Sequence, residues 1–285
     1  MSFKDILIAL TTYPEPTPAS AIDDAISLAI ALESRLSAIA CEVRIRVPGS
    51  FFGSALLDVP AMASTEARKS LINGERLLAL FESAAVKRGV FQDRILEHCL
   101  TSEIADVFVD HARVRDLTIV PMTDGDFSAR FDANWHAESI IFGSGHPTIV
   151  LPPAPKRSDV MTMDTVVVAW DSSRPAARAV ADSLPILAKA KRTCIVTVAN
   201  EKPIRGRSGE DLVRHLAHHG IEASFDAVNA AGRTIGEALA SHIGACEGDL
   251  LVMGAYGHAR IREMVLGGAT KSMLARSPVP VFFSH

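Results

Sequence analysis

The sequence has no long apolar run, no cluster of cysteines and no excess of basic residues, and each shortage excludes a class of protein. Its longest mostly apolar stretch, residues 25–32, is far shorter than the roughly 18 residues that a membrane-spanning helix needs. The four cysteines stand far apart without a C-x-x-C pair, which argues against a disulfide scaffold and predicts reduced thiols.

The net charge argues against nucleic acid as a partner, and the N-terminal residues argue against secretion. Lys and Arg number 29 against 33 Asp and Glu, giving a net charge of -4 and no overall attraction for nucleic acid. Lys4 and Asp5 are followed by only five apolar residues, too few for the core of a secretory signal. We therefore expect a cytoplasmic protein that binds neither nucleic acid nor a membrane.

The length and the residue pattern predict two folded domains. The chain has 285 residues, about twice the commonest domain size, and 48% of them are hydrophobic. Short apolar runs alternate with stretches of helical periodicity from residues 5–10 to residues 148–151, and the same order restarts at residues 165–169. A linker with three prolines, residues 151–159, separates the two series. The predicted domains are residues 1–153 and 160–285.

Near-continuous apolar strands that alternate with helices indicate an α/β fold with a parallel sheet covered on both faces. The repeat predicts this doubly wound architecture twice. The last strand of each half, residues 148–151 and 279–283, would lie at a sheet edge, and an apolar edge invites pairing. We expect these two edges to cover each other about a pseudo-twofold axis, and further pairing into a homodimer stays open.

A run of glycines follows a strand in the second half. Residues 249–253 lead directly into Gly254 and Gly257, and nine residues later Gly267 and Gly268 open a helix. Glycine lets the backbone approach a ligand closely, and the N-H groups at a helix start favour phosphate. The same spacing also fits ordinary turns and a tight helix cap, so the pattern by itself leaves both interpretations open.

Two polar side chains fall at the same predicted edge of the sheet. Asp171 follows the first strand of the second half, where its carboxylate could accept from an adenine amino group or a ribose hydroxyl. Thr270 adds a hydroxyl donor in the glycine-initiated helix. In doubly wound sheets ligands bind outside the carboxyl ends of the strands, so both side chains fall where a ligand is expected.

Two segments of the second half resemble a known family. The stretch DLLVMGAYGHARIREMVLGGATKSMLARSPVPVFF is similar to the C-terminal segment of universal stress protein domains, which carry a glycine, two residues, a glycine, nine residues, a glycine and then Ser or Thr. The stretch VVVAWDSSRPAARAV resembles the first strand of the family, with Asp171 at its acidic position. With the internal repeat, the whole chain resembles a tandem universal stress protein.

The resemblance implies a five-stranded parallel sheet flanked by helices in each half, the two packed as a pseudo-dimer. It also implies a role in stress survival and binding of ATP or another adenine nucleotide, with Mg²⁺ neutralising the phosphates. Asp171 would face adenine and ribose, and the backbone of Val198 would meet adenine. The residues that it assigns to ribose and phosphates are Gly254, Gly257, Gly267, Gly268, Ala269 and Thr270.

The chain departs from the family pattern in both halves. Gly268 replaces the Ser or Thr expected after the third glycine, a loss of one neutral hydrogen bond worth about 0.5 to 1.5 kcal/mol. In the first half Thr11 and Thr12 replace Trp170 and Asp171, and residues 123–131, after the predicted strand at 117–122, have no second glycine at the required spacing. We therefore expect only the second half to bind ATP in the manner of the family.

No catalytic or metal signature is evident in the sequence. There is no G-x-S-x-G motif and no Walker A motif, so binding without turnover is expected, and slow ATP hydrolysis has no identified base. His215 and His219 share a helix face, but no Cys or acid at ligand spacing nearby completes a metal site. The alternative hypothesis is a stress-response scaffold that has lost nucleotide binding and holds an apolar metabolite or nothing. The client protein is not predicted.

Overall fold

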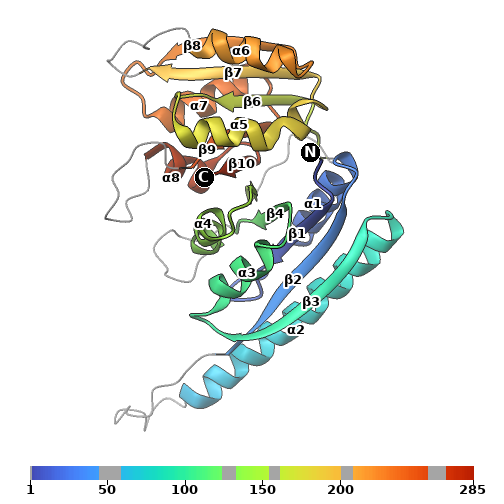
Figure 1. Cartoon of the computed structure of the whole chain (residues 1–285). Helices are drawn as coiled ribbons and strands as arrows, with labels where there is room; N and C mark the ends of the chain where they lie inside the picture. The colour runs from blue at the N-terminus through green and yellow to red at the C-terminus, as the bar shows by residue number, and fades with distance from the viewer. Residues whose placement is uncertain (1, 45–58, 124–132, 154–160, 200–207, 256–267) are drawn as a thin grey trace. The chain divides into compact units, whose positions relative to one another are not determined.

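The computed structural model describes residues 2–44, 59–123, 133–153, 161–199, 208–255 and 268–285. Contacts divide the chain into two compact units. The first unit is Lys4–Ser144, and the second unit is Gly145–His285 together with Met1–Phe3. Strands and helices alternate through both units, which confirms the predicted α/β class (Figure 1). None of the helices in the described residues is long and apolar enough to cross a membrane.

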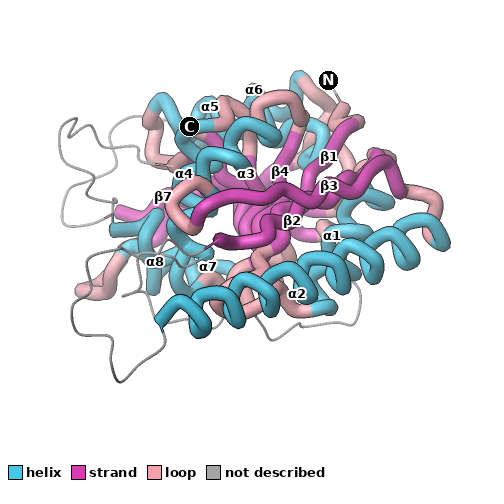
Figure 2. The backbone as a smooth tube through the Cα atoms, turned by 90° about the horizontal axis from the view of Figure 1, so that it is seen from below, coloured by secondary structure: helices cyan, strands magenta, loops and turns pink. Residues whose placement is uncertain are grey.

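The described strands of the first unit form a parallel sheet in the order β3-β2-β1-β4. The strands are β1 (Asp5–Leu10), β2 (Arg35–Arg44), β3 (Phe91–Leu100) and β4 (Leu117–Pro121). The helices are α1 (Ala19–Ala31), α2 (Val59–Lys87), α3 (Ile104–Ala112) and α4 (Ala133–Gly143). The long helix α2 runs along β2 and β3 (Figure 2). Five of the six residues of β1 are buried, as expected of a strand covered on both faces.

The second unit contains a parallel sheet in the order β10-β9-β6-β7-β8, extended at β10 by an antiparallel strand, β5. The strands are β5 (Thr148–Leu151), β6 (Thr165–Ala169), β7 (Arg192–Ala199), β8 (Ala223–Asn229), β9 (Leu250–Gly254) and β10 (Val281–Ser284). The helices are α5 (Arg174–Leu187), α6 (Ser208–His218), α7 (Ile235–Ala245) and α8 (Gly268–Arg276). The five parallel strands match the fold that the resemblance implied.

Side-chain caps fix the starts of two helices in the second unit. The hydroxyl of Ser173 accepts from the amide of Ala176 at 3.2 Å, and Pro175 stands in the first turn of α5. At the start of α7, Thr234 and Glu237 form a reciprocal capping box, each side chain accepting from the other's backbone amide. These caps hold the first turns of α5 and α7 in place beside the sheet.

The pairing of β5 with β10 closes an apolar edge of the second unit. Phe282 lies opposite Ile149 in the antiparallel ladder, and every residue of both strands is buried. The prediction that these two strands cover each other is confirmed. Because β5 is the last strand of the first sequence repeat, the repeat and the contact-based units differ by one strand, and the domain limits read from the repeat stay a prediction.

Replacing Phe282 by alanine tests how far this edge belongs to the core. The side chain is fully buried, and its ring centroid lies 6.4 Å from that of Phe3. Removing a buried phenyl ring leaves a cavity, so we expect Phe282→Ala to lower the free energy of unfolding by about 3 to 5 kcal/mol. Urea unfolding followed by circular dichroism measures the loss. The control is Val114→Ala, because this residue is 68% exposed. Equal losses of unfolding free energy in the two variants would contradict the placement of Phe282 in the core.

Candidate functional site

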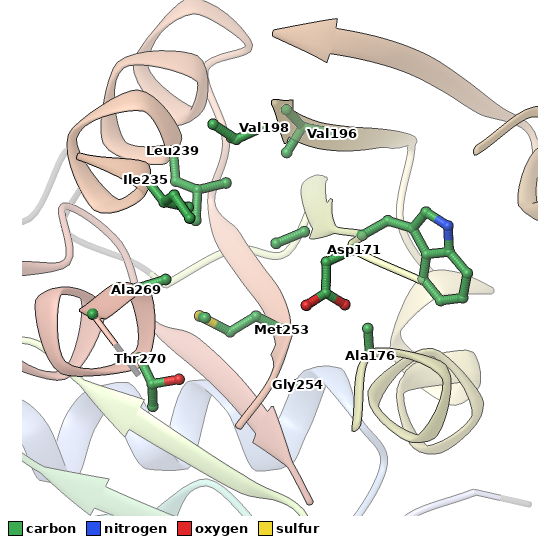
Figure 3. Close-up of a pocket in the computed structure, with 13 residues that line it drawn as sticks. Asp171, Ala176, Val196, Val198, Ile235, Leu239, Met253, Gly254, Ala269 and Thr270 are labelled. Carbon is green, nitrogen blue, oxygen red and sulfur yellow. The ribbon is translucent and has the colours of Figure 1, made fainter. Parts of the chain in front are cut away.

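A cavity of about 190 Å³ lies at the carboxyl ends of β6, β7 and β9 (Figure 3). Parallel α/β sheets bind their ligands at this edge. The volume is below the roughly 300 to 1,000 Å³ of pockets that enclose a whole drug-sized ligand, and above the about 150 Å³ that holds one benzene ring. The cavity therefore has room for one flat ring system, and the rest of a larger ligand would extend beyond it.

Apolar side chains from three elements form the walls of the cavity. They are Val196 and Val198 of β7, Met253 of β9, and Ile235 and Leu239 of α7. Such walls favour an apolar or aromatic face over a solvated charge, because burying the face removes apolar surface from water.

Asp171 brings a carboxylate to the cavity. It follows β6, and its side chain points into the space between Met253 and Ala176 (Figure 3). Its Oδ1 accepts a hydrogen bond of 2.9 Å from the amide of Ser173, which is the N-cap residue of α5. This bond orients the side chain, and Oδ2 can accept from a ligand amino or hydroxyl group.

Gly254 ends β9 where the backbone of α5 comes closest. A Cβ placed on this residue would lie 2.4 Å from the amide nitrogen of Ala176 and 2.4 Å from the carbonyl carbon of Pro175. Backbone atoms cannot yield as the end of a flexible side chain can, so packing alone requires glycine here. The first glycine of the motif thus has a structural role, whatever the cavity binds.

The first turn of α8 borders the cavity on another side. Gly268, Ala269 and Thr270 line it, and Thr270 is 3% exposed. The first N-H groups of a helix have no acceptor within the helix, and the helix dipole favours negative charge there. This turn carries no acidic residue that would repel an anion. Among the residues that the structure describes, a Cβ on Gly268 would meet nothing within 4 Å, so their packing does not require this glycine.

The cavity brings together the predicted residues that the structure describes. They are Asp171, Val198, Gly254, Gly268, Ala269 and Thr270. Gly257 and Gly267 lie outside the described residues. The apolar wall from α7 was not predicted. Ile235 and Leu239 are four residues apart after the cap at Thr234, and this spacing indicates that they share a helix face. The spacing does not indicate that this face borders the cavity. Nucleotide binding by these residues stays a prediction.

The first unit has a hollow at the end of β1, and it is closed. Among the described residues its free volume is about 0 Å³. Thr12, which stands where the second half has Asp171, donates from Oγ1 to the carbonyl of Cys41 at 2.6 Å. The same oxygen lies 2.7 Å from the hydroxyl of Ser70. The position that would meet a ligand is used by internal hydrogen bonds, which supports the expectation that this half does not bind ATP in the family's manner.

His136 of α4 is buried at the same hollow. It is 2% exposed, and its Nδ1 has no hydrogen-bond partner among the described residues. The ring packs edge-on against Phe108, with the centroids 5.6 Å apart. Burial lowers the pKa of His136 to about 4, because the apolar surroundings disfavour the charged ring. The imidazole is therefore neutral in the native protein at neutral pH.

Two α/β units, one with an open cavity at the carboxyl edge of its sheet and one with a closed hollow, define a tandem α/β protein. No protein-family model matches the sequence, and no curated protein matches it. Solved structures do match, and they show which proteins share this architecture.

The chain is similar to a universal stress protein from Archaeoglobus fulgidus DSM 4304, with a TM-score of 0.73 and 15% identity over 99% of this chain and 97% of that one. A functionally unknown protein from Pseudomonas aeruginosa PAO1 gives a TM-score of 0.57 and 13% identity over 98% and 92%. A universal stress protein in complex with cAMP shares 27% identity over 43% of this chain and 96% of its own, with a TM-score of 0.35. The resemblance to universal stress proteins is confirmed at the level of architecture. This chain has the universal stress protein fold, in tandem.

A matched pair of glycine variants separates the packing role of Gly254 from the open position of Gly268. We expect Gly254→Ala to destabilise the protein by about 1 to 3 kcal/mol, because the new methyl group meets the backbone of α5. Gly268→Ala should be neutral or stabilise by up to about 1 kcal/mol, because alanine is the better helix former and meets no neighbour in the described part of the chain. Urea unfolding of both variants gives the comparison, and a larger loss for Gly268→Ala would refute it.

The buried imidazole of His136 makes a second prediction, on acid stability. Above pH 6.5 neither the native nor the unfolded state is protonated, and the contribution to stability is complete. Between pH 6.5 and pH 4 only the unfolded chain binds the proton, so stability falls by roughly 3 kcal/mol in total. Below pH 4 both states are protonated and the loss levels off.

His136→Phe should remove this part of the pH dependence while keeping an aromatic ring beside Phe108. Unfolding free energies of the wild type and the variant, measured at intervals from pH 7 to pH 4, isolate the contribution. Parallel curves for the two proteins would show that the ring is not buried as a neutral group.

Proposed function

We propose that the second unit binds an adenine nucleotide, ATP, and that the chain serves as a cytoplasmic stress-response protein of the universal stress protein type. The observation that carries the proposal is the cavity of the second unit. An apolar slot, the carboxylate of Asp171 and the amides of a helix start border the same space. These are the surroundings that a base, a ribose and phosphates need, in that order.

The base would enter the apolar slot. Val196 and Val198 of β7 face Ile235 and Leu239 of α7 across the cavity, which has room for one flat ring system. The last residues that pair between β6 and β7 are Ala169 and Val196. Val198 lies in β7 two residues beyond the end of this pairing. Residues two apart in a strand direct their backbone groups to the same side, and the backbone of Val198 can therefore bond to the edge of a base.

The ribose would lie next to Asp171 and the phosphates next to α8. Oδ2 of Asp171 can accept from a ribose hydroxyl or an adenine amino group. The amides of Gly268, Ala269 and Thr270 offer donors at the positive end of the helix dipole. Mg²⁺ prefers phosphate oxygens and water, so it would neutralise the phosphates without needing a protein cage. Binding, rather than rapid hydrolysis, is the activity that these groups support.

A second candidate function is a stress-response scaffold that holds an apolar metabolite in place of nucleotide. The apolar walls favour it, since the lining includes five aliphatic or thioether side chains larger than alanine. The glycine at position 268 also favours it, because it offers no hydroxyl to a phosphate. Mass spectrometry of the molecule released from purified protein separates a nucleotide from an apolar ligand.

Calorimetric titration of ATP with Mg²⁺ into the full chain tests the proposal. We expect one site per chain, weakened roughly tenfold or more in Asp171→Ala because one charge-assisted hydrogen bond is lost. Gly268→Ser should tighten binding by up to about tenfold, since its hydroxyl enters open space beside the phosphates. The matched control is Asp211→Ala, an exposed carboxylate on α6 whose partner is Arg214. No heat from the wild type at millimolar ATP would reject nucleotide binding.

A further inference from the structure

Three side chains with metal-binding atoms meet in the second unit, away from the cavity. They are Asp226 of β8, His242 of α7 and Cys246, the residue that follows α7 as its C-cap. Their ligand atoms all lie within 4.8 Å of one another. Nε2 of His242 is 3.3 Å from Sγ of Cys246 and 3.8 Å from a carboxylate oxygen of Asp226. None of the three lines the cavity that we assign to nucleotide.

The backbone sets this arrangement in advance. His242 and Cys246 are four residues apart at the end of α7, so their side chains lie on one face of the helix. The amide of Cys246 donates to the carbonyl of His242 at 2.9 Å, and the carbonyl of Cys246 accepts from the guanidinium of Arg192. These two bonds fix the end of the helix. Asp226 comes from the strand next to β7, and the pairing of β7 with β8 fixes its position.

We propose that Asp226, His242 and Cys246 bind a zinc ion, with water as the fourth ligand. Sulfur, imidazole and carboxylate are the three ligand types of protein zinc sites. Two atoms bound to one tetrahedral zinc at 2.0 to 2.3 Å lie about 3.3 to 3.6 Å apart. The separations of 3.3 Å and 3.8 Å from His242 are close to this range, and the third pair, Cys246 and Asp226, lies within 4.8 Å. A thiolate and an imidazole exclude Mg²⁺ and Ca²⁺, which take oxygen ligands. Asp226 is exposed, so the ion has access from solvent and an open coordination position.

The ligands supply negative charge to a divalent cation, and one positive charge stands nearby, because the guanidinium of Arg192 donates to the carbonyl of Cys246. Asp226 contributes one negative charge, and Cys246 becomes anionic when a metal displaces its proton. Zinc binding therefore releases a proton. Without a metal, Sγ of Cys246 lies within hydrogen-bonding distance of Nε2 of His242, at 3.3 Å.

Cobalt(II) provides the most direct test because its absorption reports both the geometry and the ligands. We expect the purified full chain, freed of metal by a chelator, to bind one Co²⁺ with the visible bands of a tetrahedral site and a thiolate charge-transfer band. Zn²⁺ should displace it. Cys246→Ser should abolish the charge-transfer band, and His242→Ala and Asp226→Asn should each weaken binding by roughly 100-fold or more, because they remove a ligand.

Two controls make the result specific. His215→Ala removes one of a pair of histidines on α6 whose ring centroids lie 5.0 Å apart, and it should leave the metal affinity unchanged. Asp171→Ala alters the cavity and should also leave it unchanged, so zinc binding and nucleotide binding fail independently. Circular dichroism of each variant verifies folding. The absence of a charge-transfer band in the wild type, or an equal affinity in Cys246→Ser, would overturn the proposal.

Discussion

The close approach of β9 to α5 at Gly254 sets the geometry on which the rest of the second unit depends. Backbone atoms of Pro175 and Ala176 occupy the space that a Cβ on this residue would take. This contact holds the first turn of α5 at the carboxyl edge of the sheet. Asp171 precedes that turn and is tied to it through the amide of Ser173, so one glycine also determines where the carboxylate points. A motif residue that would ordinarily be assigned to a ligand is thus first a requirement of packing.

The two units show what one side chain does at the same place in a repeated fold. Asp171 follows β6 and borders an open cavity. Thr12, its counterpart in the sequence repeat, bonds to the carbonyl of Cys41 and closes the hollow. A hydroxyl can be satisfied by one internal carbonyl, whereas a carboxylate has only acceptors and needs donors from solvent, backbone or ligand. The exchange of acid for hydroxyl therefore turns an edge with an open cavity into a packed one.

The sequence predicted the elements because their signals are local. Apolar runs predicted the strands, and the recurrence at residues 148–151 and 279–283 predicted the pairing of β5 with β10, which the structure confirms. Glycine spacing and Asp171 predicted one side of the cavity. The wall from Ile235 could not be predicted, because tertiary packing decides which helix face meets the slot. The cluster of Asp226 and His242 was missed for the same reason, since it joins a strand to a later helix.

Helix α7 contributes side chains to two chemically different places, the apolar wall of the cavity and the cluster of Asp226, His242 and Cys246. Ile235, Leu239, His242 and Cys246 follow the spacing i, i+4, i+7 and i+11, so they form one stripe along the helix. The first half of the stripe is apolar and faces the cavity, and the second half is polar and meets exposed Asp226. A capping box fixes the start of the helix, and Gly236 packs so closely on Ser272 that α7 and α8 are held together. Both places are consequently preformed by the fold, and the side chains along the stripe decide what each can bind.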